Sequence, residues 1–301
     1  MAAVVTIVCI ASLRCGGNGP AGPTPGQTSL PPVLPGPSVP PAPAPPHVFV
    51  GAGDIAFCDN NSAITASLAD AAGGTVFTLG DHAYPAGTRQ DFRDCYEPTW
   101  GRLKSRTRPV PGNHEYLSGG GQPYFDYFGP NAGPAGLGYY SFWLGGWHAI
   151  ALNSNIPVGA GSVQAAWLRA ELETTMSSCT LAYWHHPLFT SGPNRDNPRM
   201  RDFWRILHEA GADVVLSAHD HLYERFGPQD PDGRPDPLLG IRQFIVGTGG
   251  APVYQFATVR ENSEVRISDF GVLKLTLMAD SYQWEFISVS GRGDSGTALC
   301  H

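Results

Sequence analysis

The sequence lacks long runs of basic or apolar residues. It has 19 Lys and Arg against 26 Asp and Glu, a formal net charge of −7 at pH 7, and its basic residues are scattered. Proteins that bind nucleic acid neutralise phosphates with clustered Lys and Arg, so we expect no nucleic-acid partner. No apolar stretch reaches the roughly 20 residues that a membrane-spanning helix needs, so we also expect no transmembrane span.

The first 46 residues differ in composition from the rest of the 301. Residues 2–13, AAVVTIVCIASL, resemble the apolar region of an export signal, although no Lys or Arg precedes them. Twelve of the 28 prolines fall in residues 20–46, which predicts an extended, polyproline-like tether. We therefore expect a signal-like segment over 1–15, a Pro/Gly-rich tether over 16–46 and one globular domain over 47–301, in a protein that is secreted, periplasmic or tethered to the cell surface.

Cys15, in the stretch SLRCGG, resembles the lipid-acceptor cysteine of bacterial lipoproteins, and a tether behind it would suit display at a surface. Arg14 stands where that motif has a small residue. Two alternatives stay open, a lipid anchor at Cys15 and ordinary secretion with Cys15 removed. The sequence gives no indication of oligomeric state.

Closely spaced cysteine pairs are absent, which weighs against a zinc site built from Cys-x-x-Cys. The globular region contains Cys58, Cys95, Cys179 and Cys300, and four cysteines allow three pairings. Export makes disulfides the expected state. We favour Cys58 with Cys95, flanking the candidate site, and Cys179 with Cys300, pinning the C-terminus.

Strand-like and helix-like segments alternate through the globular region. Helical patterns cover 62–74, 91–104, 162–176 and 197–211. Strand patterns cover 47–56, 75–81, 106–115, a hairpin over 139–155, 180–187, 212–221, 242–250, 271–279 and 281–291. This alternation predicts an α/β fold, in which ligands bind at the carboxyl ends of the strands.

Asp, Asn and His residues collect at five of the predicted strand ends. Singly, each could be a turn residue, a cap or a satisfied core side chain. Together, oxygen and nitrogen ligands in this number suit one or two borderline metal ions. The candidates are Asp54, Asp81, Asn113, His114, His185, His186, His219 and His221.

The order of these motifs resembles a known family. GDIA, GDHAY, GNHE, HHP and AHDH, over residues 50–226, are similar to the motifs of the calcineurin-like metallophosphoesterases. Most branches carry Asp-x-His at the first motif and Gly-Asp-x-x-Asp at the second. Here no histidine follows Asp54, and Tyr84 stands where the second acid would be. That combination resembles the purple acid phosphatase branch.

The resemblance implies a four-layer α/β/β/α sandwich and two metal ions, Fe(III) and a divalent ion that is Fe, Zn or Mn. Asp81 would bridge the two ions. The phenol of Tyr84 would bind as a phenolate, since a ferric ion can hold it deprotonated far below its usual pKa of about 10; the alternative is a tyrosine bonded to nearby backbone. The implied ferric ligands are Asp54, Tyr84 and His221, and the divalent ligands are Asn113, His185 and His219.

The resemblance implies hydrolysis of small phosphomonoesters by a hydroxide generated at the metal pair, with His114 contacting the phosphate. His186 would pack or support a ligand. A phosphodiesterase on the same site is one alternative. A non-catalytic cell-surface binding module, suggested by the tether and by the Arg-Gly-Asp sequence at 292–294, is another.

The sequence departs from the family pattern after His185. Plant-type purple acid phosphatases carry histidines nine and ten residues further on, where this chain has Asn194 and Arg195. Neither side chain gives up a proton near neutral pH, but Arg195 can clamp phosphate oxygens with its planar fork. A solvated loop arginine is the alternative. The segment YERF implies that Tyr223 and Glu224 brace His221.

Overall fold

The structure is a computed structural model that describes residues 45–58, 61–175 and 177–301. The signal-like segment, Cys15 and most of the predicted tether lie outside these residues. Among the helices described, none is long and apolar enough to cross a membrane.

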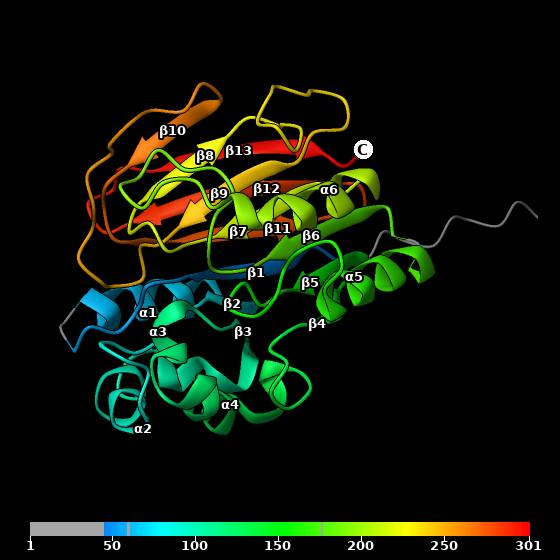
Figure 1. Ribbon diagram of the computed structural model, residues 1–301. Coiled ribbons are helices and arrows are strands. Elements are labelled where there is room, and N and C mark those ends of the chain that lie inside the picture. Colours follow the sequence, from blue (N-terminus) through cyan, green and yellow to red (C-terminus); the bar gives the residue numbers. More distant parts are fainter. Residues whose placement is uncertain (1–44, 59–60, 176) are drawn as a thin grey trace, which may run out of the picture. The chain divides into compact units, whose positions relative to one another are not determined.

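Two β-sheets form the centre of the globular region (Figure 1). The first sheet has the strand order β13 (Asp294–Leu299), β12 (Ser281–Ser288), β11 (Gly271–Leu277), β1 (His47–Ala52), β2 (Thr75–Leu79) and β3 (Thr107–Val110). The second has the order β10 (Ser263–Ile267), β8 (Tyr223–Phe226), β9 (Arg242–Val246), β7 (Val214–Ser217), β6 (Cys179–Tyr183), β5 (Trp147–Ala151) and β4 (Tyr140–Leu144).

Helices cover the outer faces of the two sheets. α1 (Asn61–Ala72) packs on β1 and β11, whereas α5 (Val163–Thr174) and α6 (Arg201–Glu209) pack against each other on the second sheet. Short helical segments fill the region after β2: α2 (Arg89–Asp91), α3 (Asn113–Tyr116) and α4 (Gln122–Phe128). The predicted four-layer α/β/β/α sandwich is confirmed.

Local sequence signals explain most of these elements. Ser162 caps α5 by accepting a hydrogen bond from the Ala165 N–H at 3.1 Å, as its position before the helical pattern predicted. The continuous helix predicted over 91–104 is wrong: the structure has a π-helical turn at Phe92–Tyr96 and a 3₁₀ segment at Trp100–Arg106. Pro98 interrupts this stretch because proline cannot donate the helical hydrogen bond and restricts the residue before it.

Aromatic side chains pack the two sheets together. The ring of Phe49 on β1 lies 4.8 Å from that of Phe77 on β2 and 5.7 Å from that of Tyr183 on β6, which belongs to the other sheet. All three side chains are fully buried. Removing rings of this size from water contributes about 1.5 to 3 kcal/mol each, so the facing sheets are held at a fixed separation.

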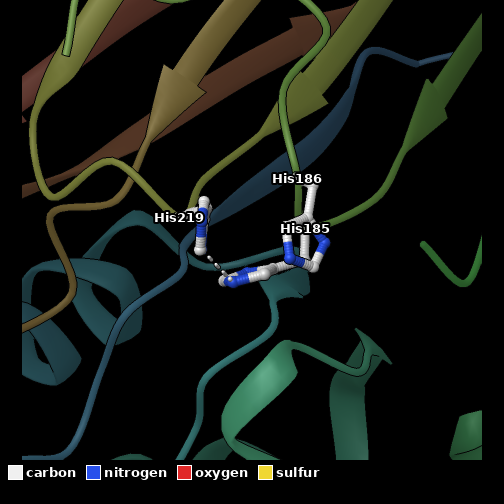
Figure 2. Close-up of side chains that lie close together, drawn as sticks. All are labelled: His185, His186 and His219. Atoms are coloured by element: carbon white, nitrogen blue, oxygen red, sulfur yellow. Dashed lines mark hydrogen bonds between the residues drawn. The ribbon is translucent and has the colours of Figure 1, made fainter. Parts of the chain in front are cut away.

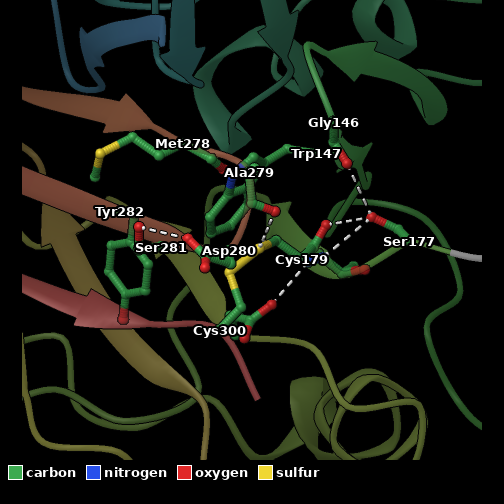
Figure 3. Close-up of a disulfide and its surroundings, with 12 residues drawn as sticks. Gly146, Trp147, Ser177, Cys179, Met278, Ala279, Asp280, Ser281, Tyr282 and Cys300 are labelled. Atoms are coloured by element: carbon green, nitrogen blue, oxygen red, sulfur yellow. Dashed lines mark hydrogen bonds between the residues drawn. A yellow bond between two sulfur atoms is a disulfide. The ribbon is translucent and has the colours of Figure 1, made fainter. Parts of the chain in front are cut away.

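Two disulfides join the four cysteines in the predicted pairs. Cys58 is bonded to Cys95, with their Cα atoms 4.5 Å apart, and Cys179 to Cys300, with theirs 5.5 Å apart. Figure 3 shows the second bond, between the first residue of β6 and the residue that follows β13. It therefore links one sheet to the other.

Candidate metal centre

The side chains predicted as ligands follow the carboxyl ends of parallel strands in both sheets. β1, β2 and β3 run parallel in the first sheet, as do β5, β6, β7 and β9 in the second. Asp54 follows β1, Asp81 and Tyr84 follow β2, Asn113 follows β3, His185 follows β6, and His219 and His221 follow β7. The structure brings all seven together.

The backbone turns sharply where these strands end. Asp54, Asp81 and His219 have φ values of 55°, 51° and 70°, a left-handed region that residues other than glycine rarely adopt. Gly112 lies against this turn, since a Cβ atom there would stand 2.1 Å from Asp81 Oδ1. The site is therefore shaped by backbone strain together with a close approach that only glycine permits.

Three side chains surround Nε2 of His185 in one half of the cluster. Its Nε2 lies 3.0 Å from Asn113 Oδ1, 3.2 Å from Asp81 Oδ2 and 3.2 Å from His219 Nδ1. Its other nitrogen, Nδ1, lies 2.7 Å from the carbonyl oxygen of Leu79. That contact orients the ring so that Nε2 faces the cluster, as carbonyl partners of metal-binding histidines do.

The hydroxyl of Tyr84 is at the centre of the other half. It lies 3.0 Å from Asp54 Oδ1, 3.2 Å from His221 Nε2 and 3.5 Å from Asp81 Oδ2. His221 Nδ1 lies 2.9 Å from the carbonyl oxygen of Pro252. Asp81 therefore reaches toward both halves, as the predicted bridging role requires.

This set of residues fits a metal pair. The side chains of Asp54 and Asp81 are almost completely buried, and neither forms an ion pair with Lys or Arg anywhere in the described ranges; histidines are their only cationic partners. Buried carboxylates need compensating positive charge. Carboxylate, phenol, amide and imidazole ligands together suit iron, zinc or manganese.

The local charges act on the protonation of the ligands. Burial, with the negative charges of Asp54 and Asp81, raises the pKa of Tyr84 well above its usual value, so the protein alone keeps the phenol protonated. Burial favours neutral His185, but the neighbouring Asp81 outweighs it and raises the pKa of His185 to about 9. Burial and the proximity of His185 lower the pKa of His219 to about 4.

His114 lies at the open side of the cluster. Its backbone N–H donates to Asp81 Oδ1 at 2.8 Å, its ring is 4.5 Å from that of Tyr84, and its side chain is 29% exposed. This position suits a contact with bound phosphate. Its neighbour Glu115 is buried and accepts the backbone N–H groups of Asp81 and Gly112 at 2.9 and 2.7 Å, an organising role that the sequence did not reveal.

His186 belongs to the same cluster although it is not a predicted ligand. Its ring lies 4.5 Å from that of His219 and 4.9 Å from that of His185 (Figure 2). One nitrogen, Nδ1, lies 2.8 Å from Ser154 Oγ. His186 thus packs against two predicted ligands, as expected.

Two exposed or half-buried rings flank the Tyr84 half and were missed from the sequence. Phe57 is 48% exposed, with its ring 5.2 Å from that of Tyr84. Tyr254 stacks on His221 at 4.1 Å with an angle of 11° between the rings. Tyr254 lies in a loop without a motif, 33 residues after His221, so no local signal could have pointed to it.

The predicted bracing of His221 by Tyr223 and Glu224 is wrong. The Tyr223 hydroxyl donates to Asp294 at 2.6 Å, and Glu224 accepts the Ser191 N–H at 2.8 Å. Tyr223 and Glu224 belong to β8, and in the described residues no hydrogen bond joins either side chain to His221.

The Arg-Gly-Asp sequence is engaged within the fold. Asp294 is the first residue of β13 and accepts hydrogen bonds from Arg225 Nε at 2.7 Å and Trp284 Nε1 at 3.2 Å. Its carboxylate is only 7% exposed. The tripeptide therefore offers no free acid for adhesion, which removes one of the two features that suggested a binding module.

Asn194 and Arg195 occupy a loop beside the cluster. Asn194 Nδ2 donates to the carbonyl oxygen of His219 at 2.9 Å. Arg195 is exposed and forms no contact with the predicted ligands in the part of the chain that is described. Its expected role in binding phosphate stays a prediction.

Comparisons with known proteins agree with this geometry. A family model described as calcineurin-like phosphoesterase matches residues 41–223, more than half of the chain. Purple acid phosphatase 15 of Arabidopsis thaliana is 27% identical over 210 residues, covering 58% of this chain and 40% of that protein. Purple acid phosphatase 21 of the same plant is 30% identical over 184 residues, covering 53% and 41%.

Solved structures share the fold. A purple acid phosphatase from yellow lupin (Lupinus luteus) seeds superposes with a TM-score of 0.75 at 20% identity, over 84% of this chain and 54% of that one. GAP50, described as the anchor in the inner membrane complex of Plasmodium, superposes with a TM-score of 0.63 at 16% identity, over 86% and 90%.

The chain spans about two fifths of the length of these two plant relatives. Within that span it keeps the five ordered motifs and the tyrosine that sets one branch apart. The chain therefore belongs to the calcineurin-like phosphoesterase family, in its purple acid phosphatase-like branch.

Proposed function

We propose that the domain over residues 47–301 hydrolyses phosphomonoesters at a binuclear centre of Fe(III) and a divalent ion. The observation that supports this most strongly is the convergence of all seven predicted ligand side chains where the strands of both sheets end. Asp54, Tyr84 and His221 would hold the ferric ion, with Asp81 shared between the ions. Asn113, His185 and His219 would hold the divalent ion.

The residues of the chain divide the work of hydrolysis. When bound, the two metal ions would lower the pKa of water toward neutrality and polarise the phosphoryl group. His114, on the open side, would donate a hydrogen bond to a phosphoryl oxygen and so stabilise the charge that develops there. Leu79 and Pro252 would keep His185 and His221 oriented through their carbonyl oxygens.

Two alternatives remain distinct from this proposal. A phosphodiesterase would use the same metal ligands, because the metal centre does not determine whether the substrate phosphate carries one ester bond or two. A non-catalytic binding module is the second alternative; the Plasmodium protein described as an anchor shares this fold. The complete ligand set favours catalysis, since a module without catalysis has no need for two buried carboxylates among histidines.

We also propose that the protein works outside the cytoplasm. The two disulfides support export, because such bonds persist in oxidising compartments. A small phosphoester is the expected partner.

Metal analysis with a panel of phosphoesters tests the proposal. We expect two metals per chain, at least one of them iron, and faster cleavage of p-nitrophenyl phosphate than of bis(p-nitrophenyl) phosphate. Asp81→Ala should abolish turnover and metal binding because it removes a ligand of both ions, whereas Asp70→Ala, at an exposed site on α1, should leave both unchanged. Full metal content and normal turnover in Asp81→Ala would overturn the bridging role. Preference for the diester would favour the phosphodiesterase.

A further inference from the structure

A pocket lies beside the metal centre, next to the loop that carries Asn194. Two arginines, Arg195 and Arg260, line it together with Thr190, Asp196 and Thr258. Its volume of about 480 Å³ falls within the roughly 300 to 1,000 Å³ of small-molecule sites.

Two loops form the walls of this pocket, and hydrogen bonds join them. The backbone N–H of Ala257 donates to the carbonyl oxygen of Ser191 at 2.8 Å, and the N–H of Arg260 donates to Ser191 Oγ at 2.9 Å. The loop over 190–197 is also anchored on the buried carboxylate of Asp220, which accepts from Thr190 Oγ1 at 2.6 Å and from the Asn194 N–H at 3.0 Å. The pocket is therefore preformed.

Both walls contact residues of the metal centre. Asn194 Nδ2 donates to the carbonyl oxygen of His219, and the Tyr254 N–H donates to that of His221 at 2.7 Å while the two rings stack. Arg195 comes directly after Asn194. A molecule held by its phosphate at the metals can thus extend into the pocket along the loop that carries Arg195.

The charges in the pocket suit an anion. Arg260 forms an ion pair with Asp196, whereas the guanidinium of Arg195 has no hydrogen bond or ion pair in the described part of the chain. Arg195 has a φ of 66°, an unfavourable value that persists because Asn194 is fixed by Asp220 and Asp196 Oδ1 accepts the Thr190 N–H at 3.0 Å. The loop thus presents an unpaired planar fork, the group best suited to binding phosphate oxygens.

We propose that Arg195 and Arg260 form a subsite for a second phosphate group, on a substrate whose first phosphate is held at the metal centre. This rests on the proposed function and narrows it to phosphoesters that carry two phosphate groups. Arg195 is then a residue that selects the substrate, at a distance from the bond that breaks.

Stable phosphonates test the subsite without turnover. We would measure calorimetrically the binding of butylphosphonate and of 1,4-butanediphosphonate to the purified protein with its own metals. Both ligands can place one phosphonate at the metals, but only the second has another anion to extend into the pocket. We expect the diphosphonate to bind about tenfold more tightly, as a charge-assisted bidentate contact implies. Diphosphonates with shorter and longer chains would then indicate the distance between the metal centre and the subsite.

Variants of three residues distinguish binding in the subsite from a general attraction between the protein and a more highly charged ligand. Arg195→Gln should remove most of the tenfold advantage and leave butylphosphonate binding unchanged. Asp196→Asn should increase the advantage, because it frees Arg260 and removes a negative charge. Arg199→Gln is the matched control, since Arg199 is exposed in the same segment but does not line the pocket.

Two results would overturn the subsite: equal affinity for the two phosphonates, or an Arg195→Gln variant that weakens both to the same extent. Failure of the proposed catalysis would look different. No ester would be hydrolysed, yet the advantage of the diphosphonate would still depend on Arg195.

Discussion

At the scale of single residues, Tyr84 shows how a side chain acquires its role from its surroundings. Its hydroxyl is buried among Asp54, Asp81 and His221. Burial, together with the negative charges of Asp54 and Asp81, raises the pKa of Tyr84. Only a strongly charged cation can reverse that effect and stabilise the phenolate. If Tyr84 binds the ferric ion as proposed, its phenolate would report on the identity of that ion.

Tyr84→Phe tests that role. The oxidised protein should be purple from charge transfer between tyrosinate and Fe(III), and the variant should lose the visible band while it keeps most of its divalent metal. Absorption spectra with metal analysis provide the measurement. Tyr254→Phe, which removes the hydroxyl of the ring that stacks on His221, should stay purple. A colourless, active wild-type protein that contains only zinc or manganese would show that Tyr84 does not bind iron.

Asn194 stands where the family resemblance places a histidine that could protonate the leaving group. It lies on the loop next to His219 and cannot donate a proton near neutral pH. We expect kcat/KM to fall steeply as the leaving-group pKa rises, so that aryl phosphates are cleaved much faster than alkyl phosphates. Asn194→His should flatten this dependence, by up to the roughly 10² to 10⁴-fold that a positioned acid supplies.

The measurement is kcat/KM across esters of graded leaving-group pKa for both proteins. A second substitution in the same loop, Pro193→Ala, serves as the control for loop disturbance. A flat dependence in the unmodified protein would mean that His114 or another group already protonates the leaving alcohol.

At the scale of elements, the turns after β2 and β3 fit together with almost no free space. A methyl group on Gly112 would lie 2.1 Å from Asp81 Oδ1 and 2.4 Å from the Asp81 nitrogen. Gly112→Ala should therefore displace Asp81, lower the metal content and cost about 1 to 3 kcal/mol of stability. Gly146→Ala, in the turn between β4 and β5 with nothing within 4 Å, should leave both unchanged.

Thermal unfolding and metal analysis of the two variants check this expectation. Normal metal content in Gly112→Ala would show that the turn can move to accommodate a methyl group, and that the position of Asp81 is set elsewhere.

The sequence predicted the elements that end at the site better than those far from it. Mostly apolar runs followed by polar motifs form four of the strands, β1, β2, β6 and β7. Both the strand conformation and the place where each strand ends could therefore be predicted. β13 was missed because its side chains alternate only between half-buried and exposed, and because Gly296 makes room for Trp284. The contact of Tyr254 with His221 arises from tertiary packing between distant segments, which no local pattern encodes.

At the scale of the whole molecule, the Cys179–Cys300 bond closes the longer of the two disulfide loops found in the described residues. It joins residues 121 positions apart and links the start of β6 to the end of β13. Constraining a loop of that length in the unfolded chain contributes about 4 to 5 kcal/mol in the chain-entropy view. The bond sits at the amino end of β6, whereas His185 follows its carboxyl end.

Replacing both cysteines with serine should therefore lower the melting temperature substantially while metal content and kcat at 25 °C stay near normal. Calorimetry, metal analysis and a rate assay measure the three quantities. Loss of metal in this double variant, at a temperature where the protein is still folded, would contradict the separation between the bond and the centre.

The division of ligands between two sheets also decides when the centre can form. Asp54, Asp81 and Asn113 belong to the first sheet, His185 and His219 to the second, and β1 itself pairs with β11 from residues 271–277. During synthesis from the amino end, the histidines emerge after the acids, and β1 gains its second neighbour later still. Under the proposed function, the metals would therefore be acquired only after the strands of both sheets have been made. If the protein is exported as proposed, the supply of iron outside the cytoplasm would be the one that matters.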